Sequence, residues 1–182
     1  MSLTRRSLLP GLAAFAPLAA AYAASPKSDP QEDQAAAATL RKLVAGSPAA
    51  RQLNDKATAV LVFPKIVKVG FLVGGSYGEG VLLQGGKPVG YYNSAAGSYG
   101  LQAGVQWFGY ALFFMNTGAL KYLDESAGFE IGVGPSVVVV DQGMGKKMTS
   151  STITQDIYAF IFNQKGLMAG LGIEGSKITK IQ

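Results

Sequence analysis

The chain has 182 residues, a formal net charge of +5, and neither histidine nor cysteine. Without histidine it lacks the commonest general base and metal ligand, and without cysteine it cannot form disulfides or thiolate metal sites. We therefore expect no metal site, no cofactor and no enzymatic activity, and the mild basic excess argues against a nucleic-acid partner. A hydrolase that uses two carboxylates is the remaining enzymatic alternative, because the sequence does not show how far apart its acids lie.

Residues 1–23 contain the three parts of a cleavable export signal. Arg5 and Arg6 supply the positive start, an apolar run follows, and Ala21 and Ala23 form the small-x-small pattern that a signal peptidase accepts. The apolar run is broken by prolines and is shorter than the roughly 20 residues of a membrane-spanning helix. The paired arginines fit the twin-arginine pattern, which indicates export to the periplasm. Cleavage would remove two of the 16 basic residues and none of the 11 acidic ones, so the net charge would fall from +5 to +3.

The rest of the chain is predicted to begin with a flexible leader and two short helices. Residues 24–34 are polar and contain two prolines, which is typical of a flexible leader. Residues 35–46 are mostly strong helix formers, and Ser47-Pro48 is a typical start for a second short helix. Residues 35–182 are expected to form a single domain.

From residue 59 onward the sequence is rich in β-branched and aromatic residues that are interrupted by glycine and proline. About ten strands are expected from this pattern, at 59–63, 66–73, 77–84, 88–93, 97–107, 110–115, 128–134, 136–141, 152–163 and 167–174. A short helix is expected at 116–125, and a hairpin turn at Gly85-Gly86. The fold class is therefore α+β, with a predominantly antiparallel, strongly bent β-sheet or partial barrel, short N-terminal helices and one short mid-chain helix.

Basic and aromatic residues supply weaker functional signals. Lys65 and Lys68 lie at a strand start and Lys146 and Lys147 in a polar loop, which makes them candidates for binding anionic lipid headgroups. Each such lysine contributes about 1 kcal/mol near a charged membrane surface, and ordinary solubilising lysines are the alternative. The aromatic residues of segment 107–114 are expected in the core, and a Trp-Phe tip that contacts a membrane interface is the alternative.

Several short sequence strings occur in a fixed order over residues 36–180. They are AVLVFP at 59–64, VGFLVGG at 69–75, YGEGVL at 77–82, SYGLQAG at 98–104, VGP at 133–135, KGLMAG at 165–170 and EG at 174–175. Together they resemble the signatures of the SYLF domain family. The resemblance implies a phospholipid-binding module in which basic residues of the N-terminal helix, here Arg41 and Lys42, and of surface loops bind headgroups. Eukaryotic members of the family bind phosphoinositides and, in fungi, actin, whereas an exported bacterial member would meet anionic bacterial phospholipids.

The expected function is that of an exported, non-catalytic phospholipid-binding module at the periplasmic face of the bacterial envelope, peripheral to a membrane. Its expected partner is an anionic phospholipid or a membrane surface. The alternative is an envelope structural or protein-interaction domain without lipid specificity, whose partner would be an envelope protein.

Overall fold

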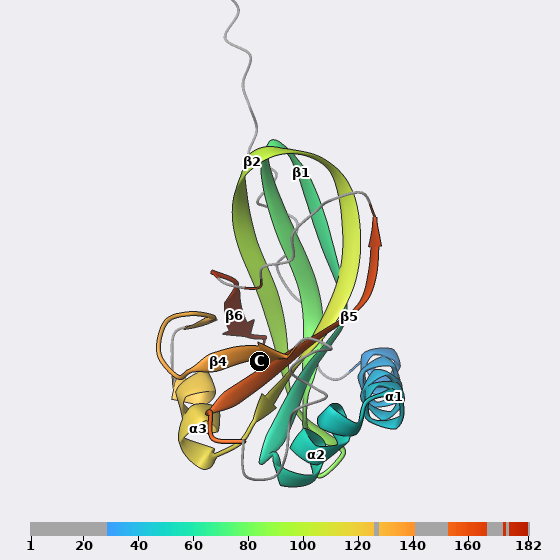
Figure 1. The fold of residues 1–182 in the computed structure, drawn as a ribbon, viewed down its shortest axis with the longest axis vertical. Helices are drawn as coiled ribbons and strands as arrows, with labels where there is room; N and C mark the ends of the chain where they lie inside the picture. The colour runs from blue at the N-terminus through green and yellow to red at the C-terminus, as the bar shows by residue number, and fades with distance from the viewer. Residues whose placement is uncertain (1–28, 126–127, 141–152, 167–172, 174, 182) are drawn as a thin grey trace, which may run out of the picture.

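The computed structural model describes residues 29–125, 128–140, 153–166, 173 and 175–181, and Figure 1 shows their arrangement. The described helices are α1 (Pro30–Gly46), α2 (Pro48–Lys56) and α3 (Thr117–Glu125). The described strands are β1 (Ala59–Gln84), β2 (Lys87–Phe114), β3 (Phe129–Glu130), β4 (Val137–Val140), β5 (Ile157–Gly166) and β6 (Lys177–Lys180). The predicted α+β fold with a mostly antiparallel, strongly bent sheet is confirmed.

A long hairpin of β1 and β2 forms the centre of the sheet. β1 pairs antiparallel with β2 from Ala59, opposite Phe114, to the turn that joins the two strands. The turn is formed by Gly85 and Gly86, whose φ angles of 56° and 77° suit a two-residue type I′ turn. β5 and β6 pair with β2, β3 pairs with β6, and β4 adds to β5 as the one parallel pair among the described strands. The hairpin bends back on itself, so that its bend projects away from all three helices (Figure 1).

The sequence predicts six strands in this hairpin, but the structure has two continuous ones. Pro64 is expected to end a strand, because it has no backbone N–H to donate to a neighbour. The register instead shifts between Phe63 and Ile66, where an extra residue of β1 forms a bulge that accommodates the proline. The Gly74-Gly75 pair likewise lies within β1 and does not end it. Glycine has no Cβ, so it permits strong bending without breaking the strand.

Gly78 and Gly80 lie where the second half of β1 passes close to its first half. A Cβ atom on Gly78 would lie 2.5 Å from the carbonyl oxygen of Lys65, and one on Gly80 would lie 2.6 Å from the carbonyl oxygen of Val62. A larger residue at either position would therefore force the two halves of the strand apart. This close approach is what curls the hairpin into a half-barrel.

The start of α1 differs from the prediction, whereas the start of α2 agrees with it. Asp29 caps α1 by accepting a hydrogen bond from the Gln31 N–H at 2.8 Å, and Pro30 occupies the first turn. Residues 30–34, which are expected in the flexible leader, are therefore helical. Ser47 caps α2 with its side chain, as the sequence predicts.

The last third of the sheet has shorter strands than the sequence predicts. Gly132 and Gly134 both have positive φ, and with Pro135 they interrupt the expected strands and leave only β3 and β4. β6 is not predicted from the sequence at all. The predicted strand at 167–174 lies outside the described residues, apart from residue 173.

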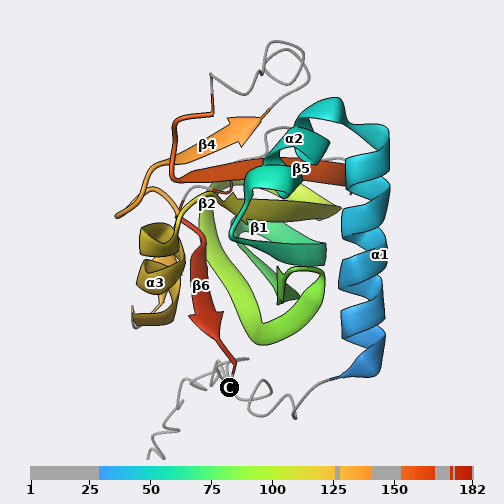
Figure 2. The ribbon, with the colours of Figure 1, turned by 90° about the horizontal axis from the view of Figure 1, so that it is seen from below.

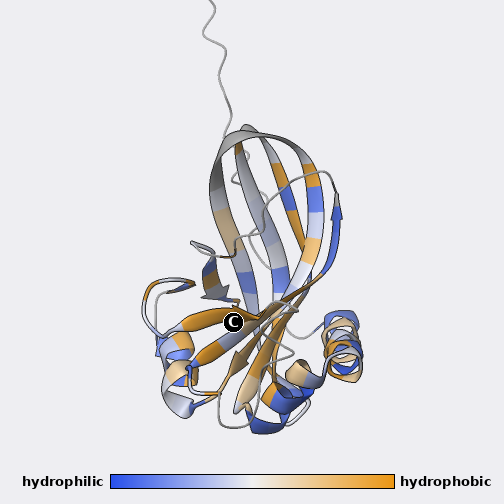
Figure 3. Cartoon of the chain, viewed as in Figure 1, coloured by the Kyte–Doolittle hydropathy of each residue, from blue (hydrophilic) through white to orange (hydrophobic). Residues whose placement is uncertain are grey.

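Separate apolar clusters cover the two faces of the sheet. Alternate residues of β2 point to opposite faces, so Leu112 and Phe114 belong to one cluster and Ala111 and Phe113 to the other. α3, β3 and β6 contribute to the first cluster, and α1 and α2 to the second (Figure 2). Apolar residues are concentrated at this helix-covered end (Figure 3). The core therefore occupies the base of the molecule and leaves the bend of the hairpin outside it.

Candidate functional site

The part of the chain that the structure describes contains neither a cluster of metal-ligating residues nor a membrane-spanning helix. There, no three acidic side chains lie close enough together to hold a metal ion. No helix within the described ranges is both long enough and apolar enough to cross a membrane. Several acids of this part of the chain form hydrogen bonds to other elements of the fold.

Asp124, at the end of α3, joins three elements of the fold. Its Oδ1 accepts hydrogen bonds from the Tyr92 hydroxyl at 2.8 Å and from Lys180 Nζ at 3.0 Å. Burial acts to raise the pKa of Asp124, but the hydrogen bonds from Lys180 and Tyr92 outweigh it and lower the pKa. Because these contacts connect α3 with β2 and β6, we assign the cluster a structural role.

Asp156, just before β5, has a similar structural role. Its Oδ1 accepts a hydrogen bond from Asn116 Nδ2 at 2.8 Å, and its Oδ2 accepts one from the Ser136 hydroxyl at 3.3 Å. The hydrogen bond from Asn116 is the main cause of the lowered pKa of Asp156. These contacts hold the start of α3 against the beginnings of β4 and β5.

A cleft between the start of α1 and β1 contains a pair of carboxyl groups. Glu32 and Glu79 are hydrogen-bonded to each other, and the Tyr77 hydroxyl donates a hydrogen bond to Glu79 Oε1 at 2.9 Å. Burial, and then the contact with Glu79, raises the pKa of Glu32 to about 7. Carboxyl groups in direct contact are too close for glycoside hydrolysis, which needs a separation of roughly 5 to 9.5 Å. Lys65 lines the same cleft, so acidic groups are among its neighbours.

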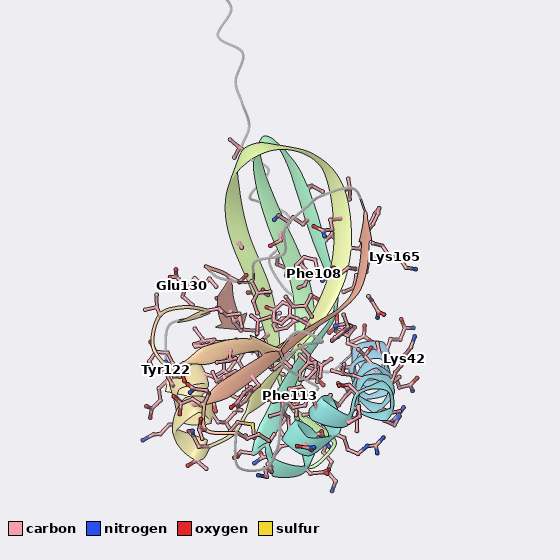
Figure 4. The ribbon with its side chains drawn as sticks, in the orientation of Figure 1. Lys42, Phe108, Phe113, Tyr122, Glu130 and Lys165 are labelled. Carbon is pink, nitrogen blue, oxygen red and sulfur yellow. The ribbon has the colours of Figure 1, made fainter. Side chains whose placement is uncertain are left out.

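The predicted headgroup-binding residues lie on separate surfaces. Lys42 is exposed on α1, as Figure 4 shows. Arg41 lines a groove between α1, α2 and the hairpin turn, whereas Lys65 lies in the cleft near the start of α1. Lys146 and Lys147 are outside the described residues. The described lysines and arginine therefore do not form one basic patch, and the headgroup role of each residue stays a prediction.

Lys68 lies on the inner face of the curled sheet. It is paired with Gln106, and the next pair on that face, Ile66 and Phe108, is buried in the core. Figure 4 shows Phe108 inside the curl of the hairpin. The side chain of Gln106 is also buried, and its Oε1 has no hydrogen-bond partner. By its register position Lys68 faces the interior, which makes it the least suited of the described candidates to contact a flat membrane.

The outer face of the same strands carries an exposed apolar strip. It consists of Val69, Val73, Val105 and Trp107, which are 49, 64, 41 and 41 % exposed and are called the outer strip below. Val69 and Val105 are direct partners in the register, and a shallow, glycine-lined groove runs beside them. On β2, Val105 and Trp107 continue the row of Ala111, whose side chain packs in the helix-covered cluster. The outer strip is thus the uncovered continuation of a face that α1 and α2 cover at the base (Figure 1).

Lys165 of β5 lies directly opposite Trp107 in the pairing of β5 with β2. It is exposed at the outer edge of the sheet, above α1 in the view of Figure 4. The predicted core position is confirmed for Phe108 and its aromatic neighbours along β2 but is wrong for Trp107. Valines in a strand ordinarily indicate a face that packs in the core, so the sequence does not predict the exposed outer strip. The one sequence signal for its exposure is the adjoining glycines, which have no side chains to cover the valines.

The distal part of the sheet carries lysines. We define this distal sheet as residues 65–78, 94–110 and 163–166, which surround the bend of the hairpin. It contains three lysines, Lys65, Lys68 and Lys165, and its nearest acid along β1 is Glu79, directly after the range. Lys68 faces the interior and Lys65 shares a cleft with Glu32 and Glu79, so the exposed Lys165 is the lysine of this region that is best placed to attract an anionic surface.

These features define a class of protein: a curled, mostly antiparallel sheet whose base is covered by helices and whose distal part is basic and partly apolar. Residues 95–182 match the family model Ysc84, which is described as "Las17-binding protein actin regulator". Over these residues, the resemblance to the SYLF domain family that the sequence strings indicate is confirmed. Among curated proteins, none matches the chain.

Proposed function

We propose that this protein is an exported, non-catalytic module that binds anionic phospholipid at the periplasmic face of the bacterial envelope. The observation that carries the proposal is the exposed Lys165 of the distal sheet, which lies opposite Trp107 beside the apolar outer strip. Lys65 is also exposed, but it lines the cleft that contains Glu32 and Glu79. A lysine close to an anionic membrane contributes about 1 kcal/mol, which is the contribution expected of Lys165.

Two exposed cations of α1 support the same proposal. Arg41 and Lys42, like Lys165, form no ion pair with any residue that the structure describes. The carboxylates of Asp124 and Asp156, by contrast, are held by internal hydrogen bonds. Arg41 and Lys42 are therefore available to an external anionic partner, as is Lys165.

A protein-interaction domain of the envelope, without lipid specificity, is the second candidate. It is supported by the description of the matched family, which names another protein as the binding partner. We favour lipid for this chain because a basic surface beside exposed apolar residues suits a membrane, which offers anionic headgroups above an apolar layer.

Export is part of the proposal and rests on residues 1–23, which lie outside the described part of the chain. The paired Arg5 and Arg6, the apolar run and the Ala21-x-Ala23 pattern support a cleaved twin-arginine signal. A protein that is exported in this way would meet the membrane from the periplasm as a peripheral binder.

Co-sedimentation with lipid vesicles tests the proposal. The purified protein is mixed at low salt with vesicles of phosphatidylcholine, with or without phosphatidylglycerol, and the pelleted fraction is measured. We expect binding to the anionic vesicles only, and weaker binding at high salt, because salt screens exposed charges. Equal binding to both vesicles, or to neither, would contradict the proposal. A stoichiometric partner captured from periplasmic extract, without lipid binding, would favour the second candidate.

A further inference from the structure

The outer strip is an apolar surface that no described element covers. Val73 is 64 % exposed, and Trp107 is 41 % exposed although it is the largest side chain of the strip. In the same row of β2, Ala111 and Phe113 are fully buried where α1 and α2 cover the sheet. A contiguous exposed apolar surface that continues a buried one is typical of an interaction site.

The charge around the outer strip favours an anionic occupant. Lys165 stands opposite Trp107, and the groove beside the strip is lined by valines and glycines, with no acid among them. A second copy of the chain docked on the same strip would bring lysines of like charge together, which opposes a dimer across this face. An acidic surface with an apolar layer beneath it satisfies both the lysines and the valines, and an anionic bilayer has this structure.

The pairing of Trp107 with Lys165 suits the layers of a membrane interface. Tryptophan is enriched at such interfaces because its ring is mostly apolar and its N–H can still donate a hydrogen bond. A neighbouring lysine can lay its apolar stem along the membrane while its ammonium group reaches the phosphates.

We infer that the outer strip is the part of this protein that enters an anionic bilayer, with Trp107 and the three valines in the interfacial layer and Lys165 at the headgroup phosphates. The inference rests on the proposed function, to which it adds the contacting surface. It also adds an apolar contribution to binding, which salt does not screen.

Fluorescence of Trp107 tests the inference directly, because it is the only tryptophan in the chain. When vesicles containing phosphatidylglycerol are added to the purified protein, we expect its emission to shift to shorter wavelength. Lipids brominated near the headgroup end of the acyl chain should quench this emission, whereas lipids brominated near the chain end should quench it less. The comparison uses phosphatidylcholine vesicles, with which the emission should stay unchanged.

A pair of double variants supplies the matched control. The strip variant combines Val69→Thr and Val105→Thr, which makes the strip more polar but keeps branched, strand-forming side chains. The control variant combines Val133→Thr and Val139→Thr, which makes the same change at two exposed valines outside the strip. The loss of two methyl groups should lower the affinity of the strip variant for anionic vesicles about tenfold. The affinity of the control variant should stay within about twofold of that of the parent. Circular dichroism and thermal melts check that both variants fold.

The outcomes separate this inference from the proposed function. Co-sedimentation with anionic vesicles without a change in Trp107 emission, or with equal affinities for the two double variants, would overturn the inference and leave the proposed function standing. No binding to any vesicle would overturn both. A dimer in solution that is dissociated by the strip variant alone would assign the surface to a second copy of the chain and would also overturn the inference.

Discussion

Lys165 of β5 lies directly opposite Trp107 of β2, so a cation and the only tryptophan of the chain share the outer face of the sheet. Directly opposite residues of an antiparallel pair project to the same side, with Cβ atoms roughly 4.5 to 5.5 Å apart. The pair therefore connects the charge of the distal sheet with its exposed apolar strip. Membrane binding through this face should depend on both.

Replacement of Lys165 should weaken binding to anionic vesicles. Lys165→Gln removes about 1 kcal/mol of attraction, which corresponds to an about fivefold lower affinity, and Lys165→Glu should have a larger effect. Lys121→Gln is the matched control, because Lys121 is also exposed but pairs with Glu125 on α3, at the base of the molecule. Vesicle titration at low salt measures all three variants. Equal losses for Lys121→Gln and Lys165→Gln would show that net charge alone matters.

The carboxyl pair of Glu32 and Glu79 should make the protein less stable as the pH rises. The pKa of Glu32 is raised from 4.5 to about 7 in the folded protein, so between these values the folded state binds more protons than the unfolded state. The free energy of unfolding should therefore fall as the pH rises from about 5 to about 8. The lowered pKa values of Asp124 and Asp156 act only at more acidic pH and do not disturb this window.

The variant Glu32→Gln should flatten this pH dependence, because an amide can still donate a hydrogen bond to Glu79 but does not titrate. Thermal melts of the parent and the variant across the same pH range provide the measurement. If the melting temperature of the variant falls with pH as steeply as that of the parent, the assignment of the slope to Glu32 is wrong.

The helices could largely be predicted because their signals are local. Ser47-Pro48 combines a capping side chain with a proline in the first turn, and the structure has α2 starting there. Asp29-Pro30 is the same signal, but the polar residues that follow it are also typical of a disordered leader. Here composition and capping predict different structures, and the capping signal agrees with the structure.

The continuity of β1 and the outer strip could not be predicted, because both depend on distant parts of the chain. Pro64 stays within β1 only because the register with β2 shifts beside it. The exposure of Trp107 depends on where α1 and α2 stop covering the sheet, which the alternation of residues does not show. Lys165 becomes a candidate only through the pairing of β5 with β2. Of the candidate site, the sequence therefore predicts basic character but not the surface that uses it.

Substitution of Gly80 should destabilise the fold. In Gly80→Ala the new Cβ would lie 2.6 Å from the carbonyl oxygen of Val62, so the two halves of β1 would have to separate. We expect a loss of about 1 to 3 kcal/mol in the free energy of unfolding. Gly97→Ala is the control, because a Cβ at Gly97 meets no atom within 4 Å. Urea denaturation compares the two, and equal midpoints would contradict the close approach of the two halves.

The buried hydrogen bond from the Tyr110 hydroxyl to Ser94 Oγ, 2.6 Å long, should stabilise the inner face of the sheet. Tyr110→Phe leaves the buried Ser94 hydroxyl without this partner, which should lower the free energy of unfolding by about 1 to 3 kcal/mol. Adding Ser94→Ala should recover part of that loss, because no polar group of the pair then remains unpaired. Urea denaturation of both single variants and the double variant measures the coupling. Strictly additive losses would show that the hydroxyl groups do not interact.

The proposed export route predicts a specific sensitivity at Arg5 and Arg6. Replacing both residues with lysine keeps the positive charge but removes the twin-arginine pattern, so the protein should remain in the cytoplasm with its signal uncleaved. Cell fractionation and the mass of the protein report both effects. Continued export of the double-lysine variant would indicate the general secretory route in place of the twin-arginine one.

The central claim is that the distal sheet binds anionic phospholipid. Its most direct measurement is the equilibrium affinity for supported bilayers whose phosphatidylglycerol content is raised stepwise at constant salt. We expect the affinity of the parent to rise with phosphatidylglycerol content, and Lys165→Glu to reduce that dependence. An affinity that does not change with phosphatidylglycerol content, or no binding at any content, would contradict the claim.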